Sequence, residues 1–165
     1  MGKVSVSFDR AGQGWLNLAL IVGDDSFVLD WLSYTTDVVG DVVRAALQIA
    51  AGGTDALARF DREPVELRML LEQRWEGVPQ QQVFRIKVLE LPDYYSDDGV
   101  AEAGEQRFGV ACDPLEFSGA VHLAAGRLLA DADAQGNLEW WGLPFPFRAF
   151  SALEAALACS RPAVR

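Results

Sequence analysis

The chain begins with alternating polar and apolar residues, the period of two expected of a β-strand with one buried face. Residues 4–8 show this alternation. Two longer apolar runs, 15–22 and 27–34, flank residues 23–26, whose Gly-Asp-Asp-Ser sequence is typical of a hairpin connection. The pattern predicts three antiparallel strands that follow one another in a meander.

The period then changes to that of a helix. Polar side chains recur at Asp37, Asp41, Arg44 and Gln48, and this spacing leaves the opposite side apolar. A threonine before Asp37 can cap the start, and two glycines after residue 51 can end it. The spacing predicts an amphipathic helix over residues 37–51.

Three more alternating segments follow, at 55–61, 65–76 and 82–91, and bring the number of expected strands to six. The periodicity breaks at residues 92–106, which contain proline, glycine and acidic residues but no repeating apolar face. We therefore expect a surface loop at 92–106.

The C-terminal third predicts two helices. The sequence Asp-Pro-Leu-Glu at 113–116 supplies a capping aspartate, a proline at the first helical position and an acid in the first turn. This helix is expected to end near Gly136, and an aromatic connector at 140–146 leads into a last helix that carries Phe150. The chain is thus expected to form one α+β domain over residues 1–165, in which a largely antiparallel sheet of about six strands is covered by one central and two C-terminal helices.

The five tryptophans are interpreted as structural. Trp15, Trp31 and Trp75 lie within expected strands and are assigned to the core, whereas Trp140 and Trp141 are expected to seal a helix against the sheet.

Charge narrows the choice of partner. The chain has 24 acidic and 14 basic residues and a formal net charge of −10. This balance disfavours nucleic acid and anionic membranes as partners and favours a basic protein. No segment has the apolar core of a signal peptide or the length of a membrane span, so we expect a cytoplasmic protein with no membrane partner.

Candidate chemistry is sparse. His122 is the only histidine, and the two cysteines, Cys112 and Cys159, are too far apart for a redox or zinc motif. Both cysteines are interpreted as buried apolar residues and His122 as a residue on the flank of a helix. A nucleophilic Cys112–His122 pair is one alternative, but no spacing supports it. The sequence predicts no catalytic residue, no metal site and no cofactor.

Acidic residues are concentrated between Glu90 and Glu116, where eight acids face Arg107 alone and contribute −7 of the net charge. Such a cluster can steer a basic partner, and adjacent tyrosines can supply buried anchors. A solvated loop that only aids solubility is the alternative. The candidate partner-binding residues are Asp93, Tyr94, Tyr95, Asp97, Asp98, Glu102 and Glu105.

Several short motifs also resemble a family of small bacterial proteins grouped with the immunity proteins of polymorphic or contact-dependent toxin systems. The motifs are Trp15 and Asn17, residues 33–37 with Asp41, residues 63–66, residues 113–117, and Phe145-Pro146. The resemblance implies a non-enzymatic protein that binds and blocks a cognate toxin, frequently a nuclease with a basic cleft. The resemblance identifies no active-site residue in this chain.

The leading hypothesis is accordingly an immunity-type protein that neutralises a basic toxin domain by occluding its surface. The alternative is a small-ligand-binding or scaffold module, suggested by the aromatic residues between 140 and 147. The sequence leaves the oligomeric state open.

Overall fold

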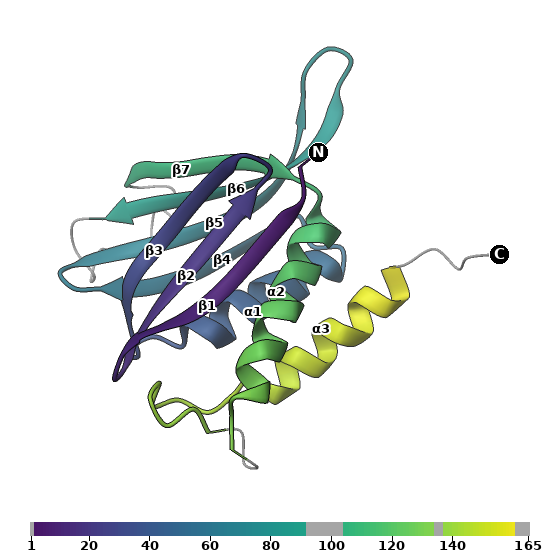
Figure 1. The fold of residues 1–165 in the computed structure, drawn as a ribbon. Helices are drawn as coiled ribbons and strands as arrows, with labels where there is room; N and C mark the ends of the chain where they lie inside the picture. The colour runs from purple at the N-terminus through teal and green to yellow at the C-terminus, as the bar shows by residue number, and fades with distance from the viewer. Residues whose placement is uncertain (1, 92–103, 134–136, 161–165) are drawn as a thin grey trace.

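In a computed structural model, the described residues 2–91, 104–133 and 137–160 form two antiparallel sheets and three helices (Figure 1). The strand order is β1-β2-β3 in one sheet and β4-β5-β6-β7 in the other. The elements are β1 Val4–Gly12, β2 Trp15–Val22, β3 Asp25–Ser33, α1 Val38–Ala50, β4 Asp55–Arg62, β5 Val65–Glu76, β6 Gln81–Leu91, β7 Glu105–Cys112, α2 Pro114–Ala130 and α3 Phe147–Ser160.

The three-stranded sheet follows directly from the alternation in the sequence. Val6 pairs with Leu20, and Leu20 pairs with Phe27, so apolar side chains of all three strands point to the same face. The opposite face carries serines and other polar residues along β1, and no helix lies in front of it in Figure 1. One face is therefore core, and the other is exposed to solvent.

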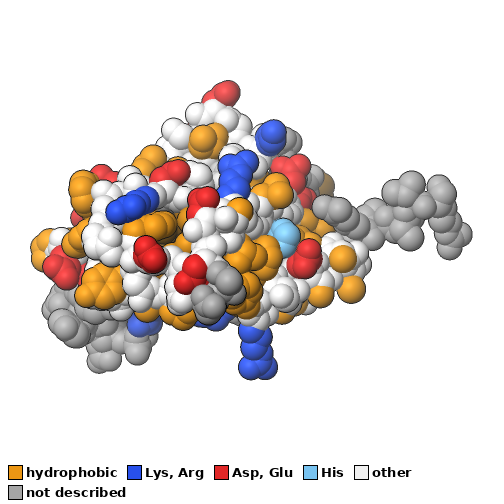
Figure 2. Space-filling view, turned by 60° about the horizontal axis from the view of Figure 1, so that its bottom comes forward, with side chains coloured by type: hydrophobic (Ala, Val, Ile, Leu, Met, Phe, Trp, Pro, Cys, Tyr) orange, Lys and Arg blue, Asp and Glu red, His pale blue; other side chains and the backbone are white. Residues whose placement is uncertain are grey.

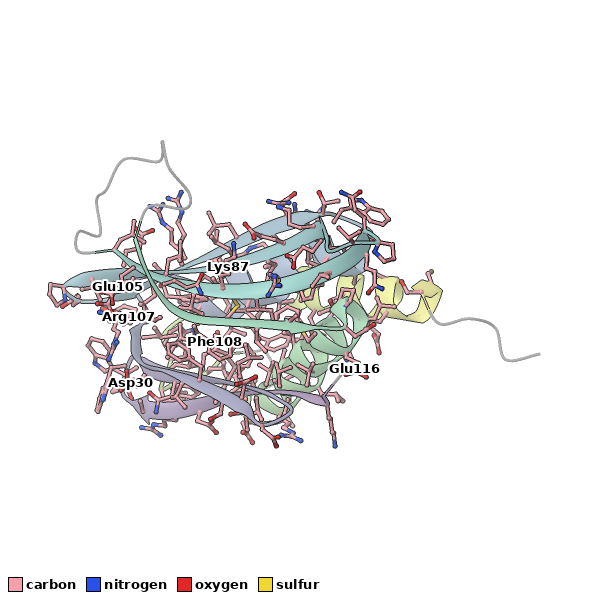
Figure 3. All side chains as sticks on the ribbon, turned by 90° about the horizontal axis from the view of Figure 1, so that it is seen from above. Asp30, Lys87, Glu105, Arg107, Phe108 and Glu116 are labelled. Atoms are coloured by element: carbon pink, nitrogen blue, oxygen red, sulfur yellow. The ribbon has the colours of Figure 1, made fainter. Side chains whose placement is uncertain are left out.

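The two sheets lie one over the other, with their strands crossing (Figures 1 and 3). At one point Phe27 of β3 stacks on Phe108 of β7, with ring centroids 5.1 Å apart. α1 packs against β4 and α2 against β1, and α3 packs against both helices. The core thus lies between the inner faces of the sheets and the helices.

Aspartates cap both α1 and α2. The sequence predicted Asp113 in this role, whereas the cap of α1 is Asp37 rather than the threonine predicted before it. The carboxylate of Asp37 accepts a hydrogen bond from the Gly40 N–H, and that of Asp113 accepts from the N–H groups of Leu115 and Glu116. Each aspartate thereby satisfies backbone donors that a helix start leaves unpaired.

The structure confirms an α+β protein but corrects its details. The predicted single six-stranded sheet is two sheets with seven strands in the described residues, because α1 separates β3 from β4 and leaves them unpaired. β7 was not predicted, and it includes residues 105 and 106 of the expected loop. α2 ends at Ala130, where Asp131 forms the cap, rather than near Gly136.

Three side chains expected in the core lie elsewhere. Trp31 and Trp75 are 54% and 65% exposed, and Cys159 is exposed on α3. Cys112 and Trp141 are buried, as predicted.

Candidate functional site

Most of the predicted acidic site lies outside the described residues. This is the case for Asp93, Tyr94, Tyr95, Asp97, Asp98 and Glu102. The chain enters residues 92–103 from β6 and leaves them toward β7, whose first residue is the remaining candidate, Glu105. The surroundings of these two strand ends are therefore the part of the site whose geometry is defined.

A chain of ion pairs joins both sheets at these strand ends. Arg62 of β4 lies 2.6 Å from Asp30 of β3 and 4.0 Å from Glu90 of β6. Arg107 of β7 binds Glu90 and Glu105 with nitrogen–oxygen distances of 2.8 Å each. Figure 3 shows Asp30, Glu105 and Arg107 at the same end of the molecule. We call these five residues the ion-pair chain.

The ion-pair chain shows how the charges of the strand ends are compensated. The hydrogen bond from Arg107 lowers the pKa of Glu90, and the same bond raises the pKa of Arg107. Glu90 is consequently ionised at neutral pH and already held by two internal cations. Arg62 and Arg107 are thus both paired within the ion-pair chain.

The described acids between Glu90 and Glu116 do not share one face. Glu105 and Glu116 lie at opposite ends of the molecule in Figure 3, because β7 and the start of α2 separate them. Asp113 is used in capping α2. On the face shown in Figure 2, the described acidic side chains are scattered rather than gathered.

Next to the ion-pair chain is an irregularity that the sequence did not reveal. Between the pairs Leu16–Leu32 and Leu18–Leu29, a single residue of β2, Asn17, lies opposite two residues of β3. This is a β-bulge. Its second residue, Trp31, has a positive φ of 53°, a conformation that is unfavourable for a side chain of this size.

Neighbouring groups hold the bulge in place. The side-chain oxygen of Asn17 accepts a hydrogen bond of 2.9 Å from the Trp31 N–H, which the bulge removes from the strand ladder. The Trp15 and Trp31 rings meet edge to face, with centroids 6.2 Å apart and an interplanar angle of 68°. The Trp31 ring is nonetheless 54% exposed.

Two more aromatic residues adjoin this pair through the turn at Gly14. The Tyr34 N–H donates to the Gly14 carbonyl, and the Gly14 N–H donates to the Trp140 carbonyl at 2.6 Å. Gly14 has a φ of 72°, and a Cβ there would lie 2.7 Å from the Tyr34 ring, so glycine is required at this position. We call Trp15, Trp31, Tyr34 and Trp140 the aromatic surface.

Cys112 and His122 do not form a catalytic pair. Burial raises the pKa of Cys112 to about 12, and the charges of Asp113 and Glu116 raise it further in the same direction. The ring of His122 stacks on Phe150, with centroids 4.4 Å apart and an interplanar angle of 7°. No hydrogen bond joins the two side chains within the described residues, and in Figure 2 the histidine appears at the surface. Cys112 is therefore a buried thiol rather than a thiolate nucleophile.

The Cys112 pKa predicts how stability depends on pH. Because the folded-state pKa exceeds the unfolded one, the stabilising contribution of this thiol is complete below pH 9 and is lost as the pH rises toward 12. We expect Cys112→Ala to reduce the fall in the free energy of unfolding over this pH range, as measured by urea denaturation. Cys159→Ala is the control, since that thiol is exposed. Equal slopes for the two variants would contradict the assignment.

The structure also bears on the alternative of a small ligand. A surface groove of about 730 Å³ lies between α1 and the start of α3, lined in part by Arg44, Leu47 and Phe147. Of the aromatic connector only Phe145 and Pro146 line it, while Trp140 and Trp141 do not, and Trp141 is buried. The connector thus mainly fills the core instead of forming a pocket.

Within the described residues, no group of three His, Cys, Asp or Glu side chains could hold a metal ion. The same part of the chain contains no helix with both the length and the apolar character needed to cross a membrane.

No protein-family model, curated protein or solved structure matches this chain. The resemblance to immunity proteins therefore stays a prediction. In the structure, hydrogen bonds link residues of three of its motifs to their surroundings near the aromatic surface. Asn17 binds the Trp31 backbone, the Thr35 hydroxyl donates to Asp61, and Asp61 accepts from the Glu63 N–H at 3.0 Å. The motifs 33–37 and 63–66, distant in sequence, are thus neighbours beside the aromatic surface.

Sequence reasoning missed Trp31 as a surface residue because an isolated tryptophan in a strand is usually buried. The one signal available was Asn17, a polar residue in the middle of an apolar strand. Its amide is needed there to satisfy the N–H that the bulge frees.

Proposed function

We propose that this chain is a non-enzymatic, immunity-type protein that binds a basic protein partner, such as a toxin domain, and occludes the partner's surface. The observation that carries the proposal is the charge of residues 92–103, read from the sequence, together with the pairing of the strand ends that flank them. That segment contains four acids and no base, and the arginines of the flanking strand ends, Arg62 and Arg107, are held in the ion-pair chain.

Acid concentrated in one segment favours a basic partner for two physical reasons. Clustered like charge raises the rate of encounter with an oppositely charged surface by roughly 10 to 10³. It also disfavours binding to acidic proteins, because two negatively charged surfaces repel each other. Exposed charge pairs contribute only about 0.2–1 kcal/mol each, so a tight complex also needs buried apolar contacts.

The proposed function is tested by co-expression with the product of the neighbouring gene. If that product is the partner, the two proteins co-purify, and the double variant Asp97→Lys/Asp98→Lys associates at least about tenfold more slowly at low salt. The association rate is measured by stopped-flow fluorescence. The matched control is Asp24→Lys/Asp25→Lys, which reverses an adjacent acid pair in the turn between β2 and β3.

Equal rates for the two double variants would remove the acidic segment from the interface. Absence of a complex with the neighbouring product would contradict the immunity assignment itself.

A further inference from the structure

We propose that the aromatic surface formed by Trp15, Trp31, Tyr34 and Trp140 is the docking surface for arginine and lysine side chains of the partner. This inference rests on the proposed function, because it names where the basic partner binds. The argument comes from the backbone at Trp31, the fixed positions of the rings, and the charges around them.

The backbone at Trp31 has no explanation in the packing of the core. A left-handed conformation costs roughly 1–2 kcal/mol for a residue with a Cβ, and asparagine or glycine adopts it more readily. In a structural role, burial of the large ring would offset this cost. Trp31 instead leaves 54% of its surface exposed. A strained residue with an exposed indole is typical of a binding site, where the ring is buried only in the complex.

The Trp15 and Trp31 rings, and the backbone that carries Tyr34 and Trp140, are held in position before any partner binds. Asn17 fixes the Trp31 backbone, and the Trp15 ring supports the Trp31 ring from the side. Backbone hydrogen bonds through Gly14 connect Tyr34 to Trp140. Rigid aromatic side chains lose little conformational entropy on binding, so they suit the role of anchors.

The charges around the aromatic surface identify the chemistry of the partner. Arg10 already lies over the Trp140 ring, 6.0 Å from its centroid, and shows that a guanidinium is accommodated here. Three acids are neighbours of this surface in the chain or in the strand pairing: Asp30 precedes Trp31, Glu139 precedes Trp140, and Asp9 pairs with Asn17. The bases recorded here are Arg10 and Arg62, and Arg62 is paired with Asp30.

Ring faces and carboxylates together form a site for cations. An arginine can stack on an indole and donate to a neighbouring carboxylate at the same time, which an acidic or purely apolar side chain cannot do. The ion-pair chain also starts at Asp30 and ends at Glu105, next to the acidic segment. Steering charge and aromatic anchors thus lie at the same end of the protein.

Trp75 provides a matched comparison within the chain. It is also an exposed strand tryptophan, at 65%, but it lies near the far end of β5. Nine residues of extended strand separate it from Glu66, which pairs with Asp61 close to Tyr34, so the distance is roughly 30 Å. Its ring lies outside the aromatic surface.

The test uses the full chain and a synthetic peptide rich in arginine and lysine, with an acidic peptide of equal length as control. Indole N–H resonances are followed by NMR during titration at low salt. We expect the basic peptide to shift the Trp15 and Trp31 resonances and leave Trp75 unchanged, and the acidic peptide to shift none. Trp31→Gly is expected to weaken binding of the basic peptide by about tenfold or more.

Stability separates the binding role of Trp31 from a structural role. Because glycine relieves the backbone strain, Trp31→Gly is expected to unfold no more easily than the parent protein in urea. Trp31→Asn is a second variant in case Trp31→Gly does not fold, because asparagine also adopts this backbone conformation. Trp75→Ala is expected to leave peptide binding unchanged. Peptide binding that survives Trp31→Gly, or that Trp75→Ala weakens equally, would overturn the proposal, as would clear destabilisation by both Trp31 variants.

The two proposals can fail separately. If the neighbouring gene product does not bind but the basic peptide binds at Trp31, the immunity assignment fails and the docking surface stands. If the neighbouring product binds Trp31→Gly as tightly as the parent protein, the immunity assignment stands and the docking surface fails.

Discussion

Replacement of Arg68 by methionine is expected to lower the free energy of unfolding by about 3–5 kcal/mol. Arg68 is fully buried in β5, and its Nε donates to the carboxylate of Glu66 at 2.5 Å. Methionine fills a similar volume but leaves the buried carboxylate without this cation, and an ion removed from water is strongly destabilising unless it is paired. Equilibrium urea denaturation measures the change.

Two controls identify the cause of this loss. Arg68→Met/Glu66→Gln removes both charges and is expected to recover a large part of the lost stability, because no buried ion is left behind. Arg85→Met breaks a pair on the same sheet, but Arg85 and Glu76 remain 40% and 35% exposed, so we expect a loss below about 1 kcal/mol. Similar losses for Arg68→Met and Arg85→Met would contradict the buried-charge explanation.

The ion pairs of the four-stranded sheet show that its outer face contributes little to the net negative charge of the chain. On its outer face Glu72 binds Lys87 at 2.9 Å, and Arg74 binds Asp55 at 2.7 Å. These pairs alternate in sign along neighbouring strands and compensate each other. The sheet therefore presents a nearly neutral surface, and the negative excess belongs to other parts of the chain.

The local signals in the sequence predicted the local structure well. Alternation identified six strands, the change of period identified α1, and the capping residue Asp113 marks where α2 begins. These signals act within a few residues, and the backbone needs no distant partner to obey them. The position at which a helix begins can therefore be predicted from the residues around it.

Structural features that depend on tertiary contacts could not be predicted from the sequence in the same way. The charged positions of β5 were expected to face solvent, yet Glu66 and Arg68 are buried, because this part of β5 is covered on both faces. β7 was missed because it is an edge strand with few buried positions, among them Val110 and Cys112. An edge strand needs fewer apolar residues and so leaves a weak pattern.

The aromatic surface is the clearest case of information that the sequence does not display. A left-handed bulge residue is usually expected at glycine or asparagine, and here it is Trp31. The partner that stabilises the bulge, Asn17, lies on the neighbouring strand and not beside it in sequence. Only the pairing register of β2 and β3 brings the two residues together.

Adjacent tryptophans in the aromatic connector are expected to lose stability to different extents when they are truncated. Trp141 is 1% exposed and belongs to the core, so Trp141→Ala is expected to lower the free energy of unfolding by about 3–5 kcal/mol. Trp140 is partly exposed and contacts the aromatic surface through its backbone carbonyl, which alanine retains. Trp140→Ala should therefore cost less than half as much, measured by thermal and urea unfolding.

Trp141→Phe refines this prediction. The indole nitrogen of Trp141 is buried without a hydrogen-bond partner in the described residues, and an unsatisfied donor costs about 1–3 kcal/mol. Phenylalanine removes this donor and keeps most of the ring, so its effect should be much smaller than that of alanine. If Trp140→Ala destabilises as strongly as Trp141→Ala, both rings are core, and the aromatic surface loses one of its members. If Trp140→Ala instead weakens peptide binding at unchanged stability, then Trp140 belongs to the docking surface, and its neighbour Trp141 belongs to the core.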